Sequence, residues 1–462
     1  MLSTSFVAAV EAIVGSVFVR QDGESRKTYG TDALKQGHPA DLVVLPASTA
    51  EVSAIAHLCN RDRVPLTPRG GGTGYTGGAV PSAGGVVLSM ERLDQILEID
   101  EPNLLAVVEP NVVTADLQEA VERVGLFYPP DPASLHQSVI GGNVAECAGG
   151  PRAFKYGTTK RYVLGLEAVL PTGEVITTGG KSVKNVVGYD LTQLLVGSEG
   201  TLAIITRIIL RLVPKPPAAA TLRVTFASVG NAVQAVADIV ADRVVPAALE
   251  LIDAACLDAI NASAEAPLVP EGTGALLLIE VDGMAEAVVE ETKRVSRACA
   301  RAGATEVRQA RDAAERSELW RLRRELSLAL RALAPLKINH DVVVPKARVP
   351  DLFDVIDGLS SELDLPMPSF GHVGDGNIHV NILLDPADEA VMRRAREAER
   401  RLFEAVIRLE GSISGEHGIG LSKAPYLGLE LSADVIALMR RLKQAFDPNG
   451  ILNPGKIFPP AT

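Results

Sequence analysis

Two histidines, His372 and His379, stand in the stretch GHVGDGNIHVN, residues 371–381. Asp375-Gly376 is a favoured pair for the two-residue turn of a β-hairpin, and a turn at that place sets the two histidines directly opposite each other. Their Cβ atoms are then about 4.5–5.5 Å apart on one face of the hairpin, close enough for both to bind one metal ion. The alternative is two ordinary polar residues at the end of a hairpin.

An adjacent acid and imidazole follow in SGEHGIG, residues 414–420. Glycines flank Glu416 and His417, so the backbone can turn tightly and the two side chains can point in different directions. Two histidines with one carboxylate make a three-ligand site that keeps open positions, which is typical of a catalytic rather than a structural divalent metal. A hydroxy acid can chelate such an ion through its carboxylate and its hydroxyl.

The stretch PRGGGTGYTGG, residues 68–78, contains the pattern G-x-G-x-x-G, which ends at Gly77. In a Rossmann domain this pattern opens a helix whose N-terminus holds a pyrophosphate. Here Pro81 and the glycine pair 84–85 follow, and they exclude that helix. The Rossmann interpretation is therefore rejected.

The same loop can instead bind an anion through consecutive backbone N–H groups, with further donors from Arg69 and Thr73. A glycine-rich surface loop without a ligand is the alternative. Similar glycines recur at 141–143, at 149–150 and at 197–200. Four such loops in one region indicate a single large, extended ligand that carries a diphosphate.

A run of cations lies in LWRLRRELS, residues 319–327, and Lys337 follows it. Arg323 and Ser327 are four residues apart, so they share one face of a helix. Arginine is suited to anchoring a carboxylate, because its planar fork binds both oxygens. Arg324 is the alternative in a register shifted by one residue, and a solvated basic helix face is the alternative for the whole run.

The chain has 462 residues, of which 47% are apolar and 22% charged, with a net charge of −12. This length predicts two or three domains. The negative balance, without a basic stripe that could neutralise phosphates, argues against nucleic-acid binding. Cys59, Cys147, Cys256 and Cys299 are far apart, which predicts reduced thiols and excludes an all-cysteine iron–sulfur cluster at ferredoxin-like spacing held by this chain alone.

No run of about 18 uncharged apolar residues occurs, so no transmembrane span is predicted. The apolar N-terminal stretch lacks a basic segment and contains Glu11. It therefore predicts a surface helix rather than a signal peptide.

Short strands and helices alternate in the first part of the chain. Strands are predicted at residues 41–46 and 85–90, as two strands within 96–110, as a hairpin over 162–180 and in the segment that ends at 213; helices are predicted at 49–63 and 114–124. The Gly/Pro-rich stretch 128–159 is predicted to be an irregular functional loop.

A proline-rich segment at 213–220 predicts the main domain boundary. Beyond it, strands at 221–228 and 275–283, a helix at 229–242 and one long charged helix to about residue 333 predict an α+β domain. A helix is predicted at 433–446. The expected domains are 1–215, 216–420 with the metal site, and a C-terminal segment 421–462 that packs back on the first domain.

The ordered series PRGGGTGYTGG, PPDP, IGGNVAECAGG, KYGTT, GLEAVLPTGEV and VGSEGTLAI resembles the FAD-binding domain of the vanillyl-alcohol-oxidase superfamily. It is most similar to the branch that contains D-lactate dehydrogenase, D-2-hydroxyglutarate dehydrogenase and the flavin subunit of glycolate oxidase, from about residue 40 to the C-terminus. The resemblance implies an α+β fold: a two-subdomain FAD-binding domain of vanillyl-alcohol-oxidase type, and an α+β substrate (cap) domain with an antiparallel sheet.

The resemblance implies FAD, extended between the two halves of the first domain, with the loop 70–78 on its pyrophosphate. Some relatives attach the flavin covalently through a histidine in this loop; Tyr75 stands there in this chain, so noncovalent FAD is expected. The residues expected to line FAD are Arg69, Gly70, Gly71, Gly72, Thr73, Gly74, Gly77, Gly78, Pro130, Asp131, Pro132, Ser138, Gly141, Gly142, Asn143, Ala145, Gly149, Gly150, Gly157, Glu199, Gly200, Ile205 and Asn453.

The resemblance also assigns roles to the polar residues described above. The expected metal ligands are His372, His379 and Glu416, with zinc as the first choice and Mn²⁺ or Fe²⁺ as alternatives. His417 is the expected catalytic base. The residues expected around the substrate are Arg323, Ser327, Lys337 and Asn381; Lys337 fits only if a few residues are inserted, and Arg324 remains the alternative.

The predicted activity is FAD-dependent and metal-dependent oxidation of a D-2-hydroxy acid, glycolate or D-lactate before D-2-hydroxyglutarate, with hydride transfer to flavin N5. The electrons pass on to oxygen, a partner subunit, a quinone, a cytochrome or an electron-transfer flavoprotein. A metal-dependent hydrolase and a noncatalytic FAD-binding subunit are the competing interpretations. The expected location is the cytoplasm, or the membrane periphery through the electron acceptor, and a homodimer is one oligomeric state that the sequence allows.

Overall fold

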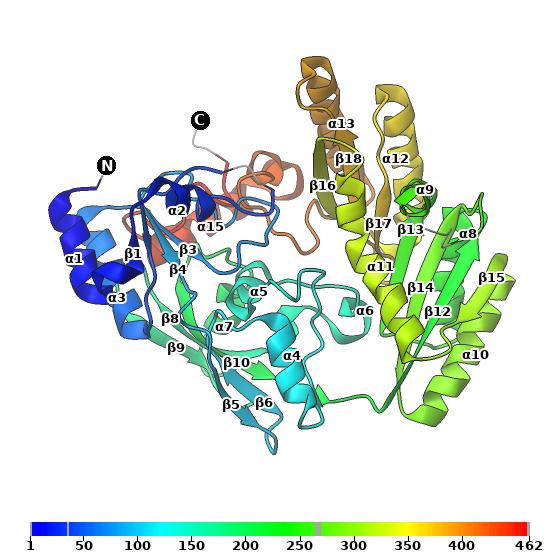
Figure 1. Ribbon diagram of the computed structural model, residues 1–462, viewed down its shortest axis with the longest axis horizontal. Helices are drawn as coiled ribbons and strands as arrows, with labels where there is room; N and C mark the ends of the chain where they lie inside the picture. The colour runs from blue at the N-terminus through cyan, green and yellow to red at the C-terminus, as the bar shows by residue number, and fades with distance from the viewer. Residues whose placement is uncertain (1, 35–36, 264–268, 460–462) are drawn as a thin grey trace. The chain divides into compact units, whose positions relative to one another are not determined.

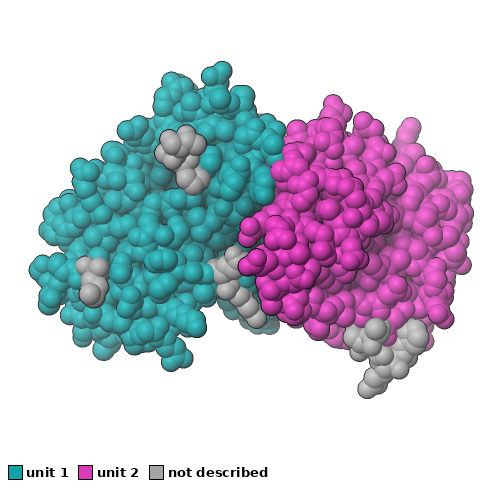
Figure 2. Space-filling view, turned by 90° about the horizontal axis from the view of Figure 1, so that it is seen from above, with its two compact units in different colours: residues 1–149, 158–215, 416–462 teal, residues 150–157, 216–415 magenta. Residues whose placement is uncertain are grey.

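The structure is a computed structural model that describes residues 2–34, 37–263 and 269–459. The chain divides into two compact units, which Figure 2 shows in different colours. Unit 1 comprises Met1–Gly149, Thr158–Lys215 and Glu416–Thr462, and unit 2 comprises Gly150–Gly157 and Pro216–Gly415. The boundary at Lys215 falls inside the proline-rich segment, whereas residues 416–420 belong to unit 1 and residues 150–157 to unit 2.

Unit 1 contains a four-stranded sheet of order β1-β2-β4-β3. Its strands are β1 (Val19–Arg20), β2 (Leu42–Val44), β3 (Leu66–Arg69) and β4 (Val86–Ser89), and β2, β4 and β3 are mutually parallel. Helices α1 (Thr4–Val14) and α3 (Thr49–Asp62) pack against each other beside it, and α2 (Gly23–Thr28) follows β1. The predicted strands and the predicted helix of this region are confirmed.

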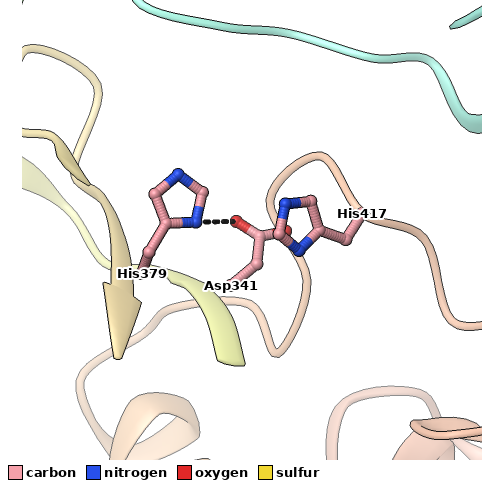
Figure 3. A group of neighbouring side chains, drawn as sticks. All are labelled: Asp341, His379 and His417. Atoms are coloured by element: carbon pink, nitrogen blue, oxygen red, sulfur yellow. Dashed lines mark ion pairs between the residues drawn. The ribbon is translucent and has the colours of Figure 1, made fainter. Parts of the chain in front are cut away.

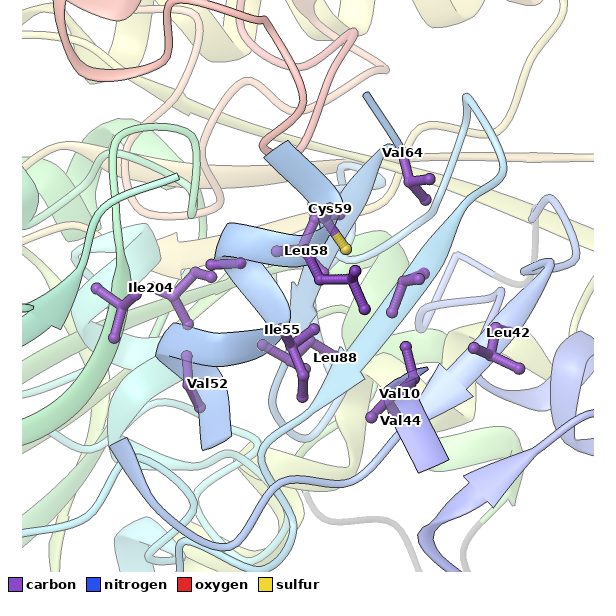
Figure 4. Packing of buried hydrophobic residues seen from close by; sticks show 14 of the residues in the cluster. Val10, Leu42, Val44, Val52, Ile55, Leu58, Cys59, Val64, Leu88 and Ile204 are labelled. Atoms are coloured by element: carbon purple, nitrogen blue, oxygen red, sulfur yellow. The ribbon is translucent and has the colours of Figure 1, made fainter. Parts of the chain in front are cut away.

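The core of this half of unit 1 is built by the apolar face of α3 (Figure 4). The hydroxyl of Ser48 caps the helix by accepting the N–H of Glu51. Val52 and Ile55 are fully buried and face the strands of the sheet, where Leu88 belongs to the same cluster. The helix and the strand β3 that follows it thus carry the chain into the glycine-rich loop.

A second, five-stranded sheet of unit 1 has the order β5-β6-β10-β8-β9 and is antiparallel throughout. Its strands are β5 (Ile96–Asp100), β6 (Leu105–Val108), β8 (Val163–Val169), β9 (Val175–Gly179) and β10 (Ile204–Arg211). Unit 1 also contains α4 (Thr114–Glu122), β7 (Leu126–Phe127), α7 (Leu191–Leu195), β11 (Val213–Pro214), α14 (Leu427–Glu430) and α15 (Ala433–Phe446).

The sequence predicts an irregular loop over residues 128–159. The structure differs, because this stretch contains two short helices. These are α5 (Ile140–Glu146) and α6 (Ala153–Tyr156). Gly141 sits in the first turn of α5, where an added Cβ would lie 2.5 Å from Cβ of Pro110. The absence of a side chain at Gly141 therefore allows α5 to pack closely against Pro110. The sequence pattern, by contrast, predicts a loop at this glycine.

Unit 2 is built on one seven-stranded sheet of order β15-β12-β14-β13-β17-β18-β16, in which every neighbouring pair is antiparallel. The strands are β12 (Ala218–Phe226), β13 (Ala248–Asp253), β14 (Ala275–Gly283), β15 (Ala304–Gln309), β16 (Leu336–Val343), β17 (Ser369–His372) and β18 (Asn377–Leu384). The sheet confirms the expected α+β class with antiparallel strands.

Helices cover both faces of this sheet (Figure 1). One face packs against α9 (Ala254–Ser263) and α11 (Ala313–Arg331). The other carries α8 (Val229–Ala241), α10 (Ala285–Arg301), α12 (Val349–Leu363) and α13 (Glu389–Arg408). Strand alternation sends a series of polar side chains to the α9/α11 face: Thr221, Arg223, Glu250, Glu280, Asp282, Lys337, Asn339, Asp341, His372, Asn377, His379 and Asn381.

The single long helix predicted up to residue 333 is wrong, because β15 separates α10 from α11. Gly303 follows the end of α10 with a φ of 84°, a left-handed value that stops the helix. The residues after it pair with β12 as an edge strand. The charged residues Glu306 and Arg308 therefore lie on a sheet edge rather than in a continuous helix.

Candidate active site

The hairpin that carries the two predicted metal-binding histidines is formed by β17 and β18. Its register pairs His372 with Asn377, so the predicted pairing of His372 with His379 is wrong by two residues. The turn covers the four residues 373–376 rather than two.

The side chains of His372 and His379 nevertheless meet. Residues opposite each other, and alternate residues of one strand, share a face of the sheet, so the two histidines are diagonal neighbours on one face. Their Nε2 atoms are 3.4 Å apart, and their rings are perpendicular at 89° with centroids 5.2 Å apart. Both side chains are buried. The predicted juxtaposition is found in the structure, although the register that was used to predict it is wrong.

Glu250 contacts Nδ1 of His372, the ring nitrogen that does not face His379. It lies directly opposite His372 in the pairing of β13 with β17, and its side chain is 0% exposed. Oε1 of Glu250 lies 2.5 Å from Nδ1 of His372. Burial acts to raise the pKa of Glu250, but the charges of Arg323 and His372 outweigh it and lower that pKa. An ionised carboxylate at Nδ1 holds the imidazole proton there and leaves Nε2 as an electron-pair donor.

Asp341 of β16 holds the corresponding place beside His379. The two residues are opposite each other in the sheet, and Oδ1 of Asp341 lies 3.9 Å from Nδ1 of His379, the ion pair drawn as a dashed line in Figure 3. The amide of Asn377 donates to Oδ1, and the N–H of Gly415 donates to Oδ2 at 2.9 Å. Each histidine therefore has a carboxylate on its Nδ1 side.

This arrangement of donors fits a divalent transition metal. Imidazole nitrogen is a preferred ligand of zinc and of related ions. Histidines that bind a metal through one ring nitrogen commonly donate the other ring N–H to a carboxylate. His372 and His379 would hold such an ion through their Nε2 atoms.

Arg323 lies on the face of α11 that packs on this sheet. Its Nε donates to Oε2 of Glu250 at 2.6 Å, and its guanidinium stands over the ring of Phe370 with 4.6 Å to the centroid. Arg323 is buried, whereas Arg324 is only half-buried. In the predicted contact with a substrate carboxylate, the guanidinium of Arg323 would therefore be shared between that carboxylate and Glu250.

Lys337 is brought back to Ser327, one helical turn beyond Arg323, because residues 332–335 connect α11 directly to β16. Nζ of Lys337 donates to Oγ of Ser327 at 2.7 Å. Lys337 is 8% exposed, and burial, assisted by the charge of Arg331, lowers its pKa to about 8. The three predicted substrate-binding residues thus lie on one helix and its neighbouring strand.

Asn381 is fully buried on the same strand as His379. Its Nδ2 donates to the carbonyl oxygens of Pro368 and His379, at 3.0 and 3.1 Å, and its Oδ1 accepts the amide of Asn339 at 2.8 Å. Both polar ends of its side chain are engaged by the sheet, so its direct contribution here is to hold the strands beside the histidines.

A pocket of about 60 Å³ lies between this sheet face and helices α9 and α11. Arg223 and Arg323 flank it, and Arg223 is paired with Glu306 at 2.6 Å. The walls are otherwise mostly apolar: Ile252, Leu257, Ile260, Asn261, Val269, Leu276, Leu278 and Leu319. It is therefore an apolar space next to the predicted carboxylate anchor.

In unit 1, the glycine-rich loop after β3 packs against the segment that leads into α5. A Cβ added at Gly70 would lie 2.5 Å from Cγ2 of Val139, and one added at Gly71 would lie 2.5 Å from O of Gln137. At Gly74, by contrast, a Cβ would meet no heavy atom within 4 Å. The loop is thus tied down on one side and open at Gly74, which fits a cradle for a ligand.

Arg69 and Gly77 are held by the segment before β2. Nη1 of Arg69 donates to O of Thr31 at 2.6 Å, and the guanidinium lies over Gly72. The N–H of Gly77 donates to Oδ2 of Asp32 at 2.7 Å. The side chain of Arg69 and the N–H of Gly77 therefore hold the glycine-rich loop in its conformation.

The predicted cofactor residues of α5 are also fixed by internal hydrogen bonds. Nδ2 of Asn143 donates to Oγ1 of Thr114 at 2.7 Å, and Oγ of Ser138 lies 3.0 Å from that same oxygen. Both side chains are buried. They position the backbone of the segment that contains Gly141, Gly142 and Ala145.

Asn453 joins three of the predicted cofactor segments. Its Nδ2 donates to O of Gly78 at 2.9 Å and to O of Glu199 at 2.8 Å. The N–H of Glu199 in turn donates to O of Ala145 at 2.8 Å. At Gly200 a Cβ would lie 2.8 Å from Cγ of Pro68. The glycine-rich segments that the sequence separates widely thus meet in one region of unit 1.

The loop that carries Glu416 and His417 joins the same region of unit 1. The ring of His417 stacks on Tyr75 at 5.3 Å and 27°, and Oγ1 of Thr76 donates to its carbonyl oxygen at 3.2 Å. A Cβ added at Gly149 would lie 2.5 Å from Oε2 of Glu416. The predicted base therefore lies against the loop that is predicted to bind the diphosphate.

The side chain of Glu199 holds the loop that carries Glu416 and His417. Its carboxylate accepts the N–H groups of Ile419 and Gly420, each at 2.7 Å. Glu199 is buried and adopts a positive φ of 53°. The sequence predicts Glu199 as a cofactor-lining residue, and the structure shows that its side chain supports the His417 loop.

Some predicted cofactor residues lie apart from these contacts. Gly150 and Gly157 are the first and last residues of the unit 2 segment that contains α6. In this segment, Oη of Tyr156 donates to Oδ2 of Asp282 at 2.7 Å. O of Pro130, within the PPDP motif, accepts the amide of Gln118, and Ile205 is a residue of β10. Asp131 and Pro132 belong to the same motif, where O of Pro132 accepts the N–H of Leu135 at 2.9 Å, and Thr73 lies in the glycine-rich loop.

Sequence reasoning missed Glu250 and Asp341. Glu250 is flanked by apolar residues in the stretch ALELID, and Asp341 precedes three valines in INHDVVV. An acid in such a run predicts a buried, paired charge. Its partner is not predictable locally, because Glu250 and His372 are 122 residues apart.

No helix in residues 2–34, 37–263 or 269–459 is long and apolar enough to cross a membrane.

Comparisons with known proteins agree with the expected fold. The p-cresol methylhydroxylase with substrate bound superimposes with a TM-score of 0.82 at 18% identity, covering 98% of this chain and 96% of that chain. The 4-ethylphenol oxidase from Gulosibacter chungangensis gives a TM-score of 0.79 at 23% identity, covering 99% and 97%. At such identities these likenesses show the fold, which confirms the vanillyl-alcohol-oxidase type.

Sequence comparison assigns both parts of the chain. Residues 40–179 match the FAD binding domain family, and residues 215–457 match the family of FAD linked oxidases, C-terminal domain. The chain is 44% identical to "Glycolate oxidase subunit GlcD" of Bacillus subtilis over 94% of its length and 92% of that protein. It is 38% identical to the protein of the same name from Escherichia coli K12 (99% and 91%), and 36% identical to "D-lactate dehydrogenase" of Anaerostipes hadrus (90% and 89%). The chain therefore belongs to the FAD-linked oxidase family of the vanillyl-alcohol-oxidase superfamily, and is an FAD-linked oxidoreductase.

Proposed function

We propose that this protein oxidises a D-2-hydroxy acid, glycolate or D-lactate, to the 2-oxo acid and passes the electrons to a separate acceptor. One observation carries the proposal: the Nε2 atoms of His372 and His379 converge to 3.4 Å, each with a carboxylate on its Nδ1 side. Such a pair suits a metal that binds a hydroxy acid. Relatives named glycolate oxidase subunit and D-lactate dehydrogenase support the substrate class.

We assign the metal to His372 and His379, with Glu416 as third ligand. Glu416 directly follows Gly415, whose N–H is bonded to Asp341, the carboxylate beside His379. Two imidazoles and a carboxylate favour zinc, with Mn²⁺ or Fe²⁺ as alternatives. When bound, the metal makes the substrate hydroxyl a stronger acid.

We assign the role of base to His417. An imidazole is suited to taking the hydroxyl proton of the substrate as a general base. Tyr75 holds its ring and Thr76 its backbone, which fixes the direction of the imidazole. A base that is held in place transfers a proton without the cost of finding its orientation.

Arg323, Ser327 and Lys337 are assigned to the substrate carboxylate. Ser327 and Lys337 are already bonded to each other, and a carboxylate can accept from both. Asn381 supports them through the sheet. Arg324 is the weaker candidate, because it is not part of the buried pair that Arg323 forms.

The cofactor is assigned to unit 1, as noncovalent FAD held by the glycine-rich segments that Asn453 joins. Backbone amides of residues 70–78 would hold the diphosphate, with Gly74 facing open space. When bound, FAD accepts the hydride from the substrate. Tyr75 in place of a histidine in this loop supports noncovalent attachment.

The alternative substrate D-2-hydroxyglutarate carries a second carboxylate and needs a second cation. Arg223 is the other cation at the pocket beside Arg323, but it is paired with Glu306, and the pocket walls are mostly apolar. This favours a monocarboxylate. A metal-dependent hydrolase is disfavoured, because it leaves the FAD-binding segments without a role.

The name "subunit" of two relatives supports a partner subunit as the electron acceptor, ahead of a quinone, a cytochrome or an electron-transfer flavoprotein. The proposal is tested by incubating the purified protein with D-lactate, L-lactate or glycolate and an artificial electron acceptor. We expect pyruvate from D-lactate and glyoxylate from glycolate. Pyruvate from L-lactate at an equal rate, or no 2-oxo acid at all, would contradict it.

A further inference from the structure

We propose that Glu250 is a positioning residue for metal binding: it fixes the tautomer and direction of His372, and Arg323 in turn holds Glu250. The inference rests on the metal site of the proposed function. It adds two residues to that site, of which Glu250 was not predicted and Arg323 was predicted only as a substrate anchor.

The first step is the position of Glu250 in the sheet. The pairing of β13 with β17 sets Glu250 opposite His372, so the two side chains leave the same face side by side. Glu250 is 0% exposed, so its oxygens depend on partners within the protein. A buried carboxylate is retained only where partners satisfy it.

Glu250 has two partners, and each one uses a different oxygen. Nδ1 of His372 lies 2.5 Å from Oε1, and Nε of Arg323 donates to Oε2 at 2.6 Å. Nη2 of Arg323 adds an ion pair to Oε2. Both partners act as donors, so the carboxylate must offer two acceptors, which Glu supplies and Gln does not.

The consequence for His372 follows from the chemistry of imidazole. With its proton held on Nδ1 by Glu250, the ring presents the lone pair of Nε2. That atom is the one that faces Nε2 of His379 at 3.4 Å. Glu250 thereby selects the tautomer that can bind a metal and removes the ring's freedom to flip.

Arg323 prevents Glu250 from turning away. Its guanidinium is stacked over Phe370, two residues before His372 on the same strand, at 4.6 Å. Helix α11 is thus connected through Arg323 and Glu250 to the histidine hairpin. Asp341 acts on His379 over a longer distance, 3.9 Å, so Glu250 is the stronger of the two carboxylate contacts.

The test uses the purified FAD-bound protein without substrate and measures zinc affinity by competition with a chromophoric chelator. Glu250→Asp keeps the charge that Arg323 needs but shortens the side chain by one methylene, so the carboxylate cannot reach both partners. Glu250→Gln removes one acceptor. Glu280→Gln is the matched control, because Glu280 is a buried acid on the same sheet face that accepts from Thr221 and Trp320 instead.

We expect zinc affinity to fall about 10- to 100-fold in Glu250→Asp and Glu250→Gln, the range known for loss of such outer contacts. Glu280→Gln should keep the wild-type affinity. Circular dichroism and flavin content show that each variant is folded. Unchanged zinc affinity in folded Glu250→Asp overturns the inference.

Wild-type protein that binds neither zinc, Mn²⁺ nor Fe²⁺ also overturns the inference, together with the metal part of the proposed function. The oxidation itself is judged separately, by reduction of the flavin with substrate. A substrate-anchoring role of Arg323 alone would not change zinc affinity in any Glu250 variant, so the two roles are distinguishable.

Discussion

Nε2 of His379 lies 3.4 Å from Nε2 of His372, although the two residues are diagonal rather than opposite in their hairpin. Each has a carboxylate opposite it in a neighbouring strand, Glu250 for His372 and Asp341 for His379. The two flanking strands therefore turn both rings toward a common point.

Removal of the metal should stop oxidation without removing the flavin. Dialysis against a strong chelator is expected to slow reduction of the flavin by substrate about 100-fold or more, because a metal contributes several kcal/mol to stabilising developing charge. The visible absorption of bound FAD should stay, and added zinc or Mn²⁺ should restore the rate. A metal-free protein that is reduced at the original rate contradicts the metal assignment.

His417→Ala should keep FAD and lose its reduction by substrate. A general base contributes about 10²- to 10⁴-fold, and stopped-flow absorption of the flavin measures the loss. His57→Ala is the control, because His57 is an exposed histidine of α3. Rapid bleaching of the flavin in His417→Ala would exclude this residue as the base.

Substrate binding should weaken as the pH rises through about 8, the pKa to which burial lowers Lys337. Only the ammonium form attracts the substrate carboxylate, so KM should rise about tenfold per pH unit above that value. Lys337→Arg should move this rise to higher pH, since arginine stays charged. The titration of Lys337 falls between roughly pH 7 and pH 10. If KM of the wild-type protein does not change over this range, Lys337 does not bind the substrate carboxylate.

Stability should respond to the same group with the opposite sign. The folded-state pKa of Lys337, about 8, lies below the ordinary value of 10.5, so the unfolded chain binds more protons between these values. The free energy of unfolding should therefore gain from this residue as the pH rises through that window. Chemical denaturation of wild type and Lys337→Met at two pH values measures the difference, which should vanish in the variant.

Glu199→Gln should loosen the loop of His417. Glutamine has one acceptor for the two N–H groups of Ile419 and Gly420 that Glu199 now accepts. One unsatisfied buried N–H costs about 1–3 kcal/mol, measurable by denaturation, and misplacement of His417 should slow flavin reduction. Glu98→Gln is the control, because Glu98 is exposed and paired with Lys181. Equal rates and stabilities of the two variants would contradict the support role.

The histidine hairpin shows what the sequence could and could not predict. The types and spacing of the residues predict two histidines on one hairpin face, which the structure shows. The turn length is not predictable from Asp375-Gly376 alone, because Gly376 adopts a φ of 83° close to the carbonyl oxygen of Val344, the residue after β16. That contact, rather than the local turn preference, favours the four-residue turn.

Nonlocal strand pairing explains the other differences. Glu250 becomes part of the site only because β13 pairs with β17, far along the chain. Edge strand β15 is not predictable locally, because its charged residues, such as Arg308 and Glu306, are typical of a helix, and only pairing with β12 makes the segment a strand. Local patterns predict the strands and helices here, and the partner strand decides what each polar residue does.

Oxidation of a D-2-hydroxy acid by this protein is best tested by anaerobic titration of the oxidised protein with glycolate, D-lactate, L-lactate and D-2-hydroxyglutarate, monitored by the visible absorption of the flavin. The account predicts bleaching by D-lactate or glycolate at lower concentration than by D-2-hydroxyglutarate, and no bleaching by L-lactate. Flavin that stays oxidised with glycolate, D-lactate and D-2-hydroxyglutarate alike, in protein shown to hold FAD and metal, would contradict it.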